Sequence, residues 1–161
     1  EDLEGTVVDL GTGTGILALG AALRSPERVI GVERDAVGLA VARENAEALD
    51  PPTPVAWLHG DATRAPVGTN GATVVMNPPF GAQHGNRNAD RAFLQTAAEI
   101  GAVSYSIHNA GSESFVDAFA TDAGGTVTHA FGARLDLDRQ FDHHAADSET
   151  IDVEVFRIRW E

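Results

Sequence analysis

Four consecutive residues, Asn77, Pro78, Pro79 and Phe80, have the side chains needed to hold a planar amine in place. The two prolines fix φ and lack N–H groups, so the turn is stiff and the preceding carbonyls are free to accept hydrogen bonds. Asn77 adds a side-chain acceptor, and Phe80 adds a ring on which a flat base can stack. We interpret them as candidate catalytic residues that aim an amine nitrogen at an electrophile. A rigid turn with Phe80 in the core is the alternative.

A glycine-rich segment near the start of the chain has a binding role of its own. It follows an apolar run that begins at Val7, and a helix from Ile16 to Arg24 is expected after it. Glycines let the backbone approach a ligand closely, and a helix N-terminus presents free N–H groups. The candidate cofactor-binding residues of this segment are Asp9, Gly11, Thr12, Gly13 and Gly15.

Two further acids follow the next two apolar runs. Glu33 comes directly after the run from Val29 to Val32, where it can accept from ribose hydroxyls. Asp61 comes after an expected strand, Val55 to Leu58, and can accept from the exocyclic amine of a bound adenine. A turn or helix-capping role is the alternative for Asp61. Together with Asn77, which also faces this edge, these acids predict a site for a nucleoside cofactor.

The glycine spacing bears on which nucleoside is bound. A dinucleotide site has the pattern G-x-G-x-x-G, whereas position 16 here is Ile. Asp9 would repel a phosphate, but it suits a cationic amino-acid portion. The acid, the glycine turn and the second acid together resemble the S-adenosylmethionine site of class I methyltransferases. A glycine-rich loop without a ligand is the alternative.

Strand and helix patterns alternate along most of the chain, which indicates an α/β fold with a parallel sheet covered on both faces. The last two expected strands, 126–137 and 151–160, alternate in polarity and are predicted to be antiparallel to each other. The other predicted elements are strands 72–76 and 103–107 and helices 36–49 and 89–100.

A set of polar and aromatic residues is expected at the carboxyl edge of this sheet, near the candidate turn. The candidates for contact with RNA are His108, after the fifth expected strand, and Arg139, Phe141 and His143 in the last loop. A surface histidine or a packed hairpin is the alternative for these positions. Adjacent histidines in the last loop point apart and no helical histidine pair occurs, so no metal site is predicted.

Composition sets further limits. The 161 residues suit a single domain spanning 1–161, with 24 acidic residues against 11 arginines, no lysine, no cysteine and a net charge of −13. We expect a soluble, cytoplasmic protein, because the chain shows no membrane span and no signal-peptide pattern. An acidic, lysine-free surface also suits a protein that works in molar salt, although an ordinary acidic protein is the alternative.

From about Val7 to Ile158 the chain resembles the archaeal predicted RNA methylases related to methyltransferase-like protein five, the 18S ribosomal RNA adenine-N6 methyltransferase. The matching segments are Asp9 to Gly15, Met76 to Gly81, Tyr105 to His108, and Arg139 to Phe141 with His143. The resemblance implies a Rossmann-like class I fold with seven strands and an antiparallel last strand. It also implies S-adenosylmethionine as methyl donor, adenine in structured RNA as acceptor and, given the composition, a halophilic archaeon as the source.

The resemblance further implies a protein partner, a small zinc-binding methyltransferase activator that forms a heterodimer by pairing with an exposed strand. Val55 and Trp57, on the third strand at one edge of such a sheet, are the expected docking residues.

The chain departs from the family pattern at three points. Thr12 stands where relatives usually have Cys, and Glu33 where they usually have Asp. Relatives also carry an N-terminal helix and a Gln-Tyr-Pro-Thr segment, so a leading segment is expected to be missing. Two other functions stay open: methylation of a glutamine amide in a release factor, and a non-catalytic RNA-binding or assembly subunit.

Overall fold

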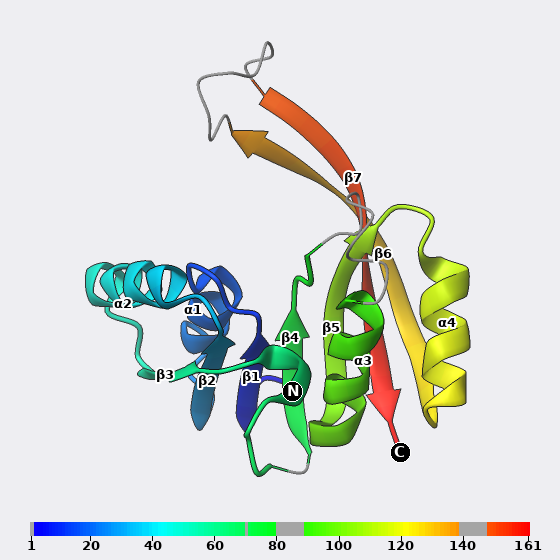
Figure 1. Cartoon of the computed structure of the whole chain (residues 1–161), viewed down its shortest axis with the longest axis horizontal. Coiled ribbons are helices and arrows are strands. Elements are labelled where there is room, and N and C mark those ends of the chain that lie inside the picture. The colour runs from blue at the N-terminus through cyan, green and yellow to red at the C-terminus, as the bar shows by residue number, and fades with distance from the viewer. Residues whose placement is uncertain (1, 70, 80–88, 139–147) are drawn as a thin grey trace.

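The protein is a seven-stranded sheet with helices on both faces (Figure 1). The computed structural model describes residues 2–69, 71–79, 89–138 and 148–161. The strand order is β3-β2-β1-β4-β5-β7-β6, and β7 alone runs antiparallel to its neighbours. This arrangement confirms the predicted fold class, including the reversed last strand.

The helices and strands alternate as the sequence predicts. The first half contains β1 (Thr6–Leu10), α1 (Ile16–Ala22), β2 (Arg28–Glu33), α2 (Ala36–Leu49), β3 (Val55–His59) and the short 3₁₀ helix η1 (Ala62–Arg64). The second half contains β4 (Ala72–Met76), α3 (Ala89–Ile100), β5 (Gly101–Asn109), α4 (Glu113–Asp122), β6 (Gly125–Asp138) and β7 (Ser148–Trp160).

Three predicted elements, α2, β4 and α3, have the predicted bounds. Helix α1 ends two residues before the predicted Arg24, because Ser25 takes a positive φ of 60° and Pro26 cannot continue a helix. Strands β2, β3, β5, β6 and β7 are each longer than predicted, since pairing with neighbours extends them past the apolar run.

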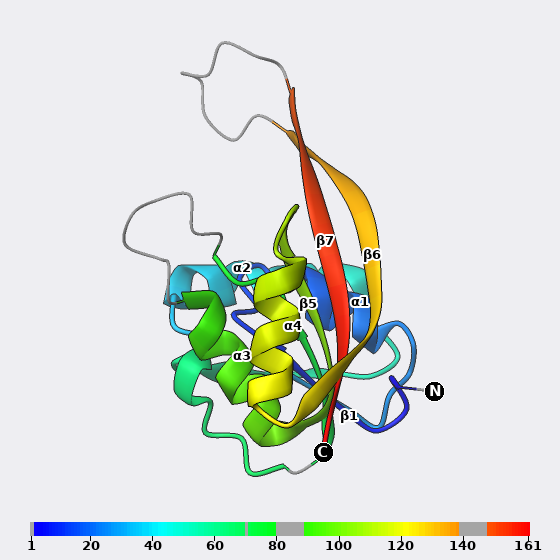
Figure 2. The ribbon, with the colours of Figure 1, turned by 90° about the vertical axis from the view of Figure 1, so that its right-hand side faces the viewer.

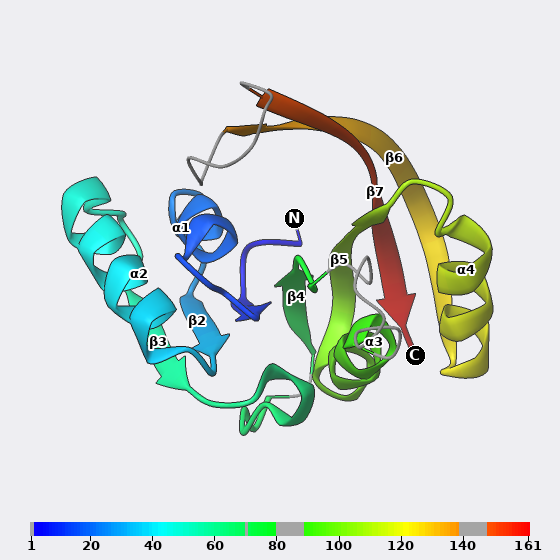
Figure 3. The ribbon, with the colours of Figure 1, turned by 45° about the horizontal axis from the view of Figure 1, so that its top comes forward.

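Helices α1 and α2 cover one face of the sheet, and α3, α4 and η1 cover the other (Figure 3). The larger core lies under α3 and α4 and includes Leu10, Met76, Leu94 and Phe156. A smaller core lies under α1. The two cores hold the carboxyl ends of β1, β2 and β4 in fixed register.

Strand β5 has an unusual distribution of polar residues. Its alternate residues Ser104, Ser106 and His108 are buried beneath the helices of the larger core, while Val103, Tyr105 and Ile107 on the opposite face are only partly buried. The ordinary pattern places apolar residues inside and polar residues outside. Here the polar residues of the strand lie inside.

The β6–β7 hairpin extends beyond the rest of the sheet (Figure 2). Strand β5 pairs with β7 over Val153 to Arg159, whereas β6 pairs with β7 over almost its whole length. The outer part of the hairpin is therefore a two-stranded ladder past the end of β5.

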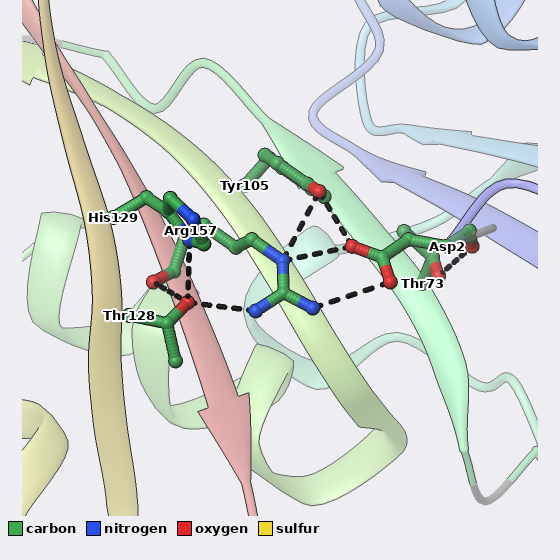
Figure 4. A network of polar contacts seen from close by, with 6 residues as sticks. All are labelled: Asp2, Thr73, Tyr105, Thr128, His129 and Arg157. Atoms are coloured by element: carbon green, nitrogen blue, oxygen red, sulfur yellow. Dashed lines mark hydrogen bonds and ion pairs between the residues drawn. The ribbon is translucent and has the colours of Figure 1, made fainter.

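A polar network on the α1 side of the sheet joins residues from both ends of the chain (Figure 4). The Arg157 guanidinium donates to both carboxylate oxygens of Asp2, at 2.8 and 3.2 Å, and to the Thr128 hydroxyl at 2.7 Å. The Tyr105 hydroxyl donates to Asp2 Oδ2 at 2.5 Å, and the Thr73 hydroxyl donates to the Asp2 carbonyl. The network fixes the start of the chain across β4, β5 and β7.

Candidate functional site

The glycine-rich segment forms a tight loop between β1 and α1. Gly11 has a φ of 70°, and a Cβ there would lie 2.9 Å from the Phe93 ring. Gly15 has a φ of 88°, and a Cβ there would lie 2.8 Å from the Trp57 ring. Only glycine combines these φ values with such close neighbours. The N–H groups of Gly11 and Thr12 both donate to the Val32 carbonyl at 2.9 Å, so the loop lies close against the carboxyl end of β2.

Asp9 holds this loop from beneath. Its Oδ2 accepts from the Thr12 hydroxyl at 2.5 Å and from the Ala18 N–H at 2.9 Å, and the residue is only 1% exposed. Burial raises the pKa of Asp9 to about 6, although both hydrogen bonds oppose the shift. The bonded carboxylate oxygen therefore positions the loop from inside, and the predicted contact of Asp9 with a cationic part of the cofactor stays a prediction.

Glu33 lies at the carboxyl end of β2, facing the loop. Its Oε2 accepts from the Gly13 N–H at 3.0 Å, and its Oε1 accepts from the N–H groups of Arg34 and Asp35 at 2.9 Å each. A carboxylate oxygen has two acceptor positions, so Oε2 can accept one more hydrogen bond. This geometry suits the predicted contact with a ribose hydroxyl.

Asp61 follows β3 and caps η1. Its Oδ1 accepts from the Thr63 N–H at 2.9 Å and the Thr63 hydroxyl at 2.8 Å, which confirms the capping alternative for this residue. These hydrogen bonds, the backbone one first, lower the pKa of Asp61, so its carboxylate is charged at neutral pH. Oδ2 makes no hydrogen bond to the described residues and can still accept from an exocyclic amine.

These acids line one pocket together with the start of the candidate turn. The pocket has a volume of about 380 Å³ and lies at the carboxyl ends of β1 to β4. Gly11, Glu33, Asp61, Asn77 and Pro79 line it. Asn77 and Pro79 are exposed and Pro78 is buried. These five predicted residues therefore converge where α/β sheets bind ligands, in a space large enough for a nucleoside. The predicted residues Asp9, Thr12, Gly13 and Gly15 are not among the lining residues of the pocket.

Five residues of the pocket wall were missed by sequence reasoning, among them Ala62, which follows Asp61 directly. Arg34 and Thr63 follow the two acids, and Ala89 and Phe93 come from the first turns of α3. Arg34 and Thr63 could have been found from their positions beside Glu33 and Asp61. Phe93 gave no signal, since an aromatic residue at helical spacing indicates core packing.

His108 is the predicted RNA-contact residue that the structure places differently. It is 1% exposed, in edge contact with the Phe156 ring at 5.7 Å, and its Nδ1 lies 3.7 Å from Asp90 Oδ2. Both the direct contact with RNA and the surface location are wrong, because α3 covers this face of β5. The other candidates, Phe80, Arg139, Phe141 and His143, lie outside the described residues.

Strand β3 is an edge of the sheet, as predicted. Val55 and Trp57 are partly buried, and the Trp57 ring packs over Gly15 and Gly31. The outer backbone of β3 is therefore the part of this edge that a partner strand could pair with.

No helix of the described residues is long and apolar enough to cross a membrane. Within the same part of the chain, no group of three or more histidine and acidic side chains is placed to hold a metal ion.

The fold and the pocket define a class I methyltransferase, and comparison with known proteins agrees. Residues 1–127 match the model of the methyltransferase small domain, so the chain belongs to that family. This confirms the predicted enzyme class, a methyltransferase that uses S-adenosylmethionine.

Individual relatives show which methyltransferases this chain is similar to. An uncharacterised protein of Methanocaldococcus jannaschii is 34% identical over 94% of this chain and 72% of its own length. The Danio rerio rRNA N(6)-adenosine-methyltransferase METTL5 is 31% identical over 94% of this chain and 74% of its own length, so the predicted resemblance is confirmed. The crystal structure of PH1948 from Pyrococcus horikoshii, a proposed RNA methyltransferase, has a TM-score of 0.84 and 37% identity, covering 99% of this chain and 76% of that one.

Proposed function

We propose that this protein transfers a methyl group from S-adenosylmethionine to the N6 amine of an adenine in structured ribosomal RNA. The observation that carries the proposal is the position of Asn77 and Pro79 on the wall of the pocket formed by Gly11, Glu33 and Asp61. An amine held by the turn then faces the cofactor. Similarity to rRNA N(6)-adenosine-methyltransferases over nearly the whole chain supports RNA as substrate.

The residues of the chain act mainly by alignment. When bound, S-adenosylmethionine supplies an electrophilic methyl group. Glu33 holds the ribose and Asp61 the adenine of the cofactor, while the loop from Gly11 to Gly15 approaches its remaining part. Asn77 and the Pro78 carbonyl accept from the target amine and fix its nitrogen, and Phe80 stacks on the flipped base. No strong general base is required for this reaction.

The loop between the last two strands is proposed to contact the RNA beyond the target base. Arg139 and Phe141 remain the proposed residues for backbone contact and base stacking, with His143 beside them. An acidic, lysine-free chain fits RNA binding in molar salt, where stacking and shape replace counterion release. We therefore propose a halophilic archaeal enzyme that acts in the cytoplasm, where ribosomal RNA is found.

We also propose a heterodimer with a small zinc-binding activator that adds a strand to the edge of β3. The support is the outer side of β3, which pairs with no other strand of the described residues and could therefore accept an added strand. Val55 and Trp57 lie on this strand, and both are only partly buried, so both could contact the partner.

Methylation of a release-factor glutamine is the second candidate. Release factor glutamine methyltransferases match this chain at 36–40% identity, but only over 76–84 residues, about half of it. The rRNA methyltransferases match 94–98% of the chain. The extent of the match favours RNA.

Mapping the transferred label separates these functions. The full-length protein, with and without the activator, is incubated in molar salt with radiolabelled S-adenosylmethionine, ribosomal RNA and release factor. Label recovered as N6-methyladenine in RNA supports the proposal, and label in glutamine moves the function to the release factor. Cofactor binding without transfer to either substrate would contradict both and favour a non-catalytic subunit.

A further inference from the structure

A group of buried polar atoms without partners lies between β5 and α3. Ser106 Oγ, both ring nitrogens of His108 and Asp90 Oδ1 are buried and make no hydrogen bond in the described part of the chain. Buried polar groups are almost always hydrogen-bonded, because each unpaired one lowers stability. Four such atoms at one interface therefore need an explanation other than stability.

The residues around His108 leave Asp90 as its natural partner. On the neighbouring strand β7, the register places Glu154 opposite His108, but the Glu154 carboxylate accepts from the Ser112 N–H at 3.0 Å and so caps α4. Phe156, two residues further along β7, offers only a ring edge. From α3, Asp90 Oδ2 lies 3.7 Å from His108 Nδ1, slightly too far for a hydrogen bond.

This group touches both sides of the candidate site. Ser106 pairs with Met76, the residue before the Asn77 turn, and His108 lies two residues further along the same parallel strand. Asp90 belongs to the first turn of α3, which also carries the pocket residues Ala89 and Phe93. A change in the distance between His108 and Asp90 therefore shifts the pocket wall relative to the turn.

We propose that His108, acting through Asp90, is a positioning residue for methyl transfer. The pair ties β5 to the first turn of α3, and the 3.7 Å gap closes to a direct hydrogen bond when the cofactor pocket fills. Hydrogen bonds at active sites are often long in the free enzyme and tighten in the complex. Two measurements test this role. The first, the kinetics of methyl transfer, rests on the proposed function, whereas the second, amide hydrogen exchange, does not.

Variants of His108 separate positioning from stability. His108→Phe keeps a flat ring but removes both nitrogens, so the midpoint of thermal unfolding should stay the same or rise while kcat falls at least tenfold and KM stays within threefold. His108→Asn, which restores a donor near the Nδ1 position, should unfold at a lower temperature yet recover at least part of kcat. If His108 had a purely structural role, the activity of each variant would follow its unfolding midpoint, and His108→Phe would be more active than His108→Asn.

Hydrogen exchange gives a readout that needs no acceptor substrate. In the wild-type protein, S-adenosylhomocysteine should slow amide exchange in the first turns of α3, residues 89–96, and His108→Phe should lose at least half of that slowing. His129→Phe is the matched control, because His129 is exposed on β6, stacked on Phe131 and outside the pocket. It should behave as wild type in both measurements.

The kinetic and exchange measurements distinguish a failure of the proposed methyl transfer from a failure of the positioning role of His108. If the wild-type protein methylates neither substrate, the proposed function fails, and the exchange measurement still decides the role of His108. Equal slowing of exchange in wild type and His108→Phe overturns the positioning role, and so does unchanged kcat in a stably folded His108→Phe.

Discussion

The Glu33 carboxylate accepts a hydrogen bond from the backbone N–H of Gly13, twenty residues earlier, at 3.0 Å. One acid at the end of β2 therefore both shapes the glycine loop and faces the pocket. Glu33→Gln should weaken binding of S-adenosylmethionine at least tenfold, since a hydrogen bond to a charged group contributes about 1.5–3 kcal/mol. Isothermal titration calorimetry measures this loss directly.

Glu47→Gln is the control for that prediction, because it removes an exposed carboxylate from α2 without touching the pocket. Its affinity for the cofactor should equal that of wild type. Equal affinity for the cofactor in both variants would show that Glu33 does not take part in cofactor binding.

Asn77→Ala should abolish most methyl transfer while leaving cofactor binding within about threefold of wild type. The side chain is proposed to orient the target amine, and loss of one oriented polar contact in a transition state typically lowers kcat by about 10²–10³. Single-turnover kinetics on the mapped substrate, with calorimetry for the cofactor, tests both parts. Full activity in Asn77→Ala would remove the assigned role.

Asp9 should make the protein more stable as pH falls from 6 to 4. Its pKa is about 6 in the folded protein and near 3.8 when exposed, so the folded state binds a proton first and is stabilised on acidification. The difference of about two pH units corresponds to roughly 2–3 kcal/mol. Asp9→Asn should remove this rise, which urea unfolding at a series of pH values would show. A slope unchanged by the substitution would contradict the assignment.

Asp2 should make the protein less stable as pH falls from 4 to 2. Hydrogen bonds from Arg157 and Tyr105 lower the pKa of Asp2 to about 2, so the stabilisation is present above pH 4 and is lost as pH falls from 4 to 2. Because Asp2 is partly exposed, the contribution is roughly 1–2 kcal/mol. Unfolding of Asp2→Asn, compared with the exposed control Asp117→Asn, measures it. Equal acid sensitivity of the two variants would show that the network does not stabilise the fold.

Two serines on the same face of β5 should respond differently to removal of the hydroxyl. Ser104 Oγ accepts from the Trp160 Nε1–H at 3.1 Å, whereas Ser106 Oγ has no partner in the described residues. Ser104→Ala leaves a buried donor unpaired and should cost about 1–3 kcal/mol, while Ser106→Ala should be neutral or stabilising. Guanidinium unfolding of the two variants gives the comparison, and equal losses would contradict it.

Much of the fold and part of the site could be predicted from local sequence. Glu33 and Asp61 each follow a short apolar run, and parallel strands bring their carboxyl ends to one edge, so their convergence needed no tertiary information. The glycine loop and the Asn77 turn were found in the same way. Helix α2 kept its predicted bounds, with Asp35 accepting from the Val37 N–H at its start and Pro51 just past its end.

The missed features depend on which elements cover each face. Ser104, Ser106 and His108 alternate with apolar residues, and local pattern places such polar residues outside. Helix α3 instead covers the polar face, so His108 is buried. The contact of Asp2 with Arg157 joins residues 155 positions apart, and Phe93 enters the pocket only because α3 packs beside Gly11. No local pattern encodes these contacts.

The packing of Trp57 over Gly15 gives the protein a built-in optical reporter. The chain has two tryptophans, and the second, Trp160, lies buried near the far end of the sheet. In a Trp160→Phe background, indole emission would arise from Trp57 alone, within van der Waals reach of the cofactor loop. Movement of that loop on ligand entry would then change fluorescence intensity, so its kinetics could be followed by stopped flow without an added label.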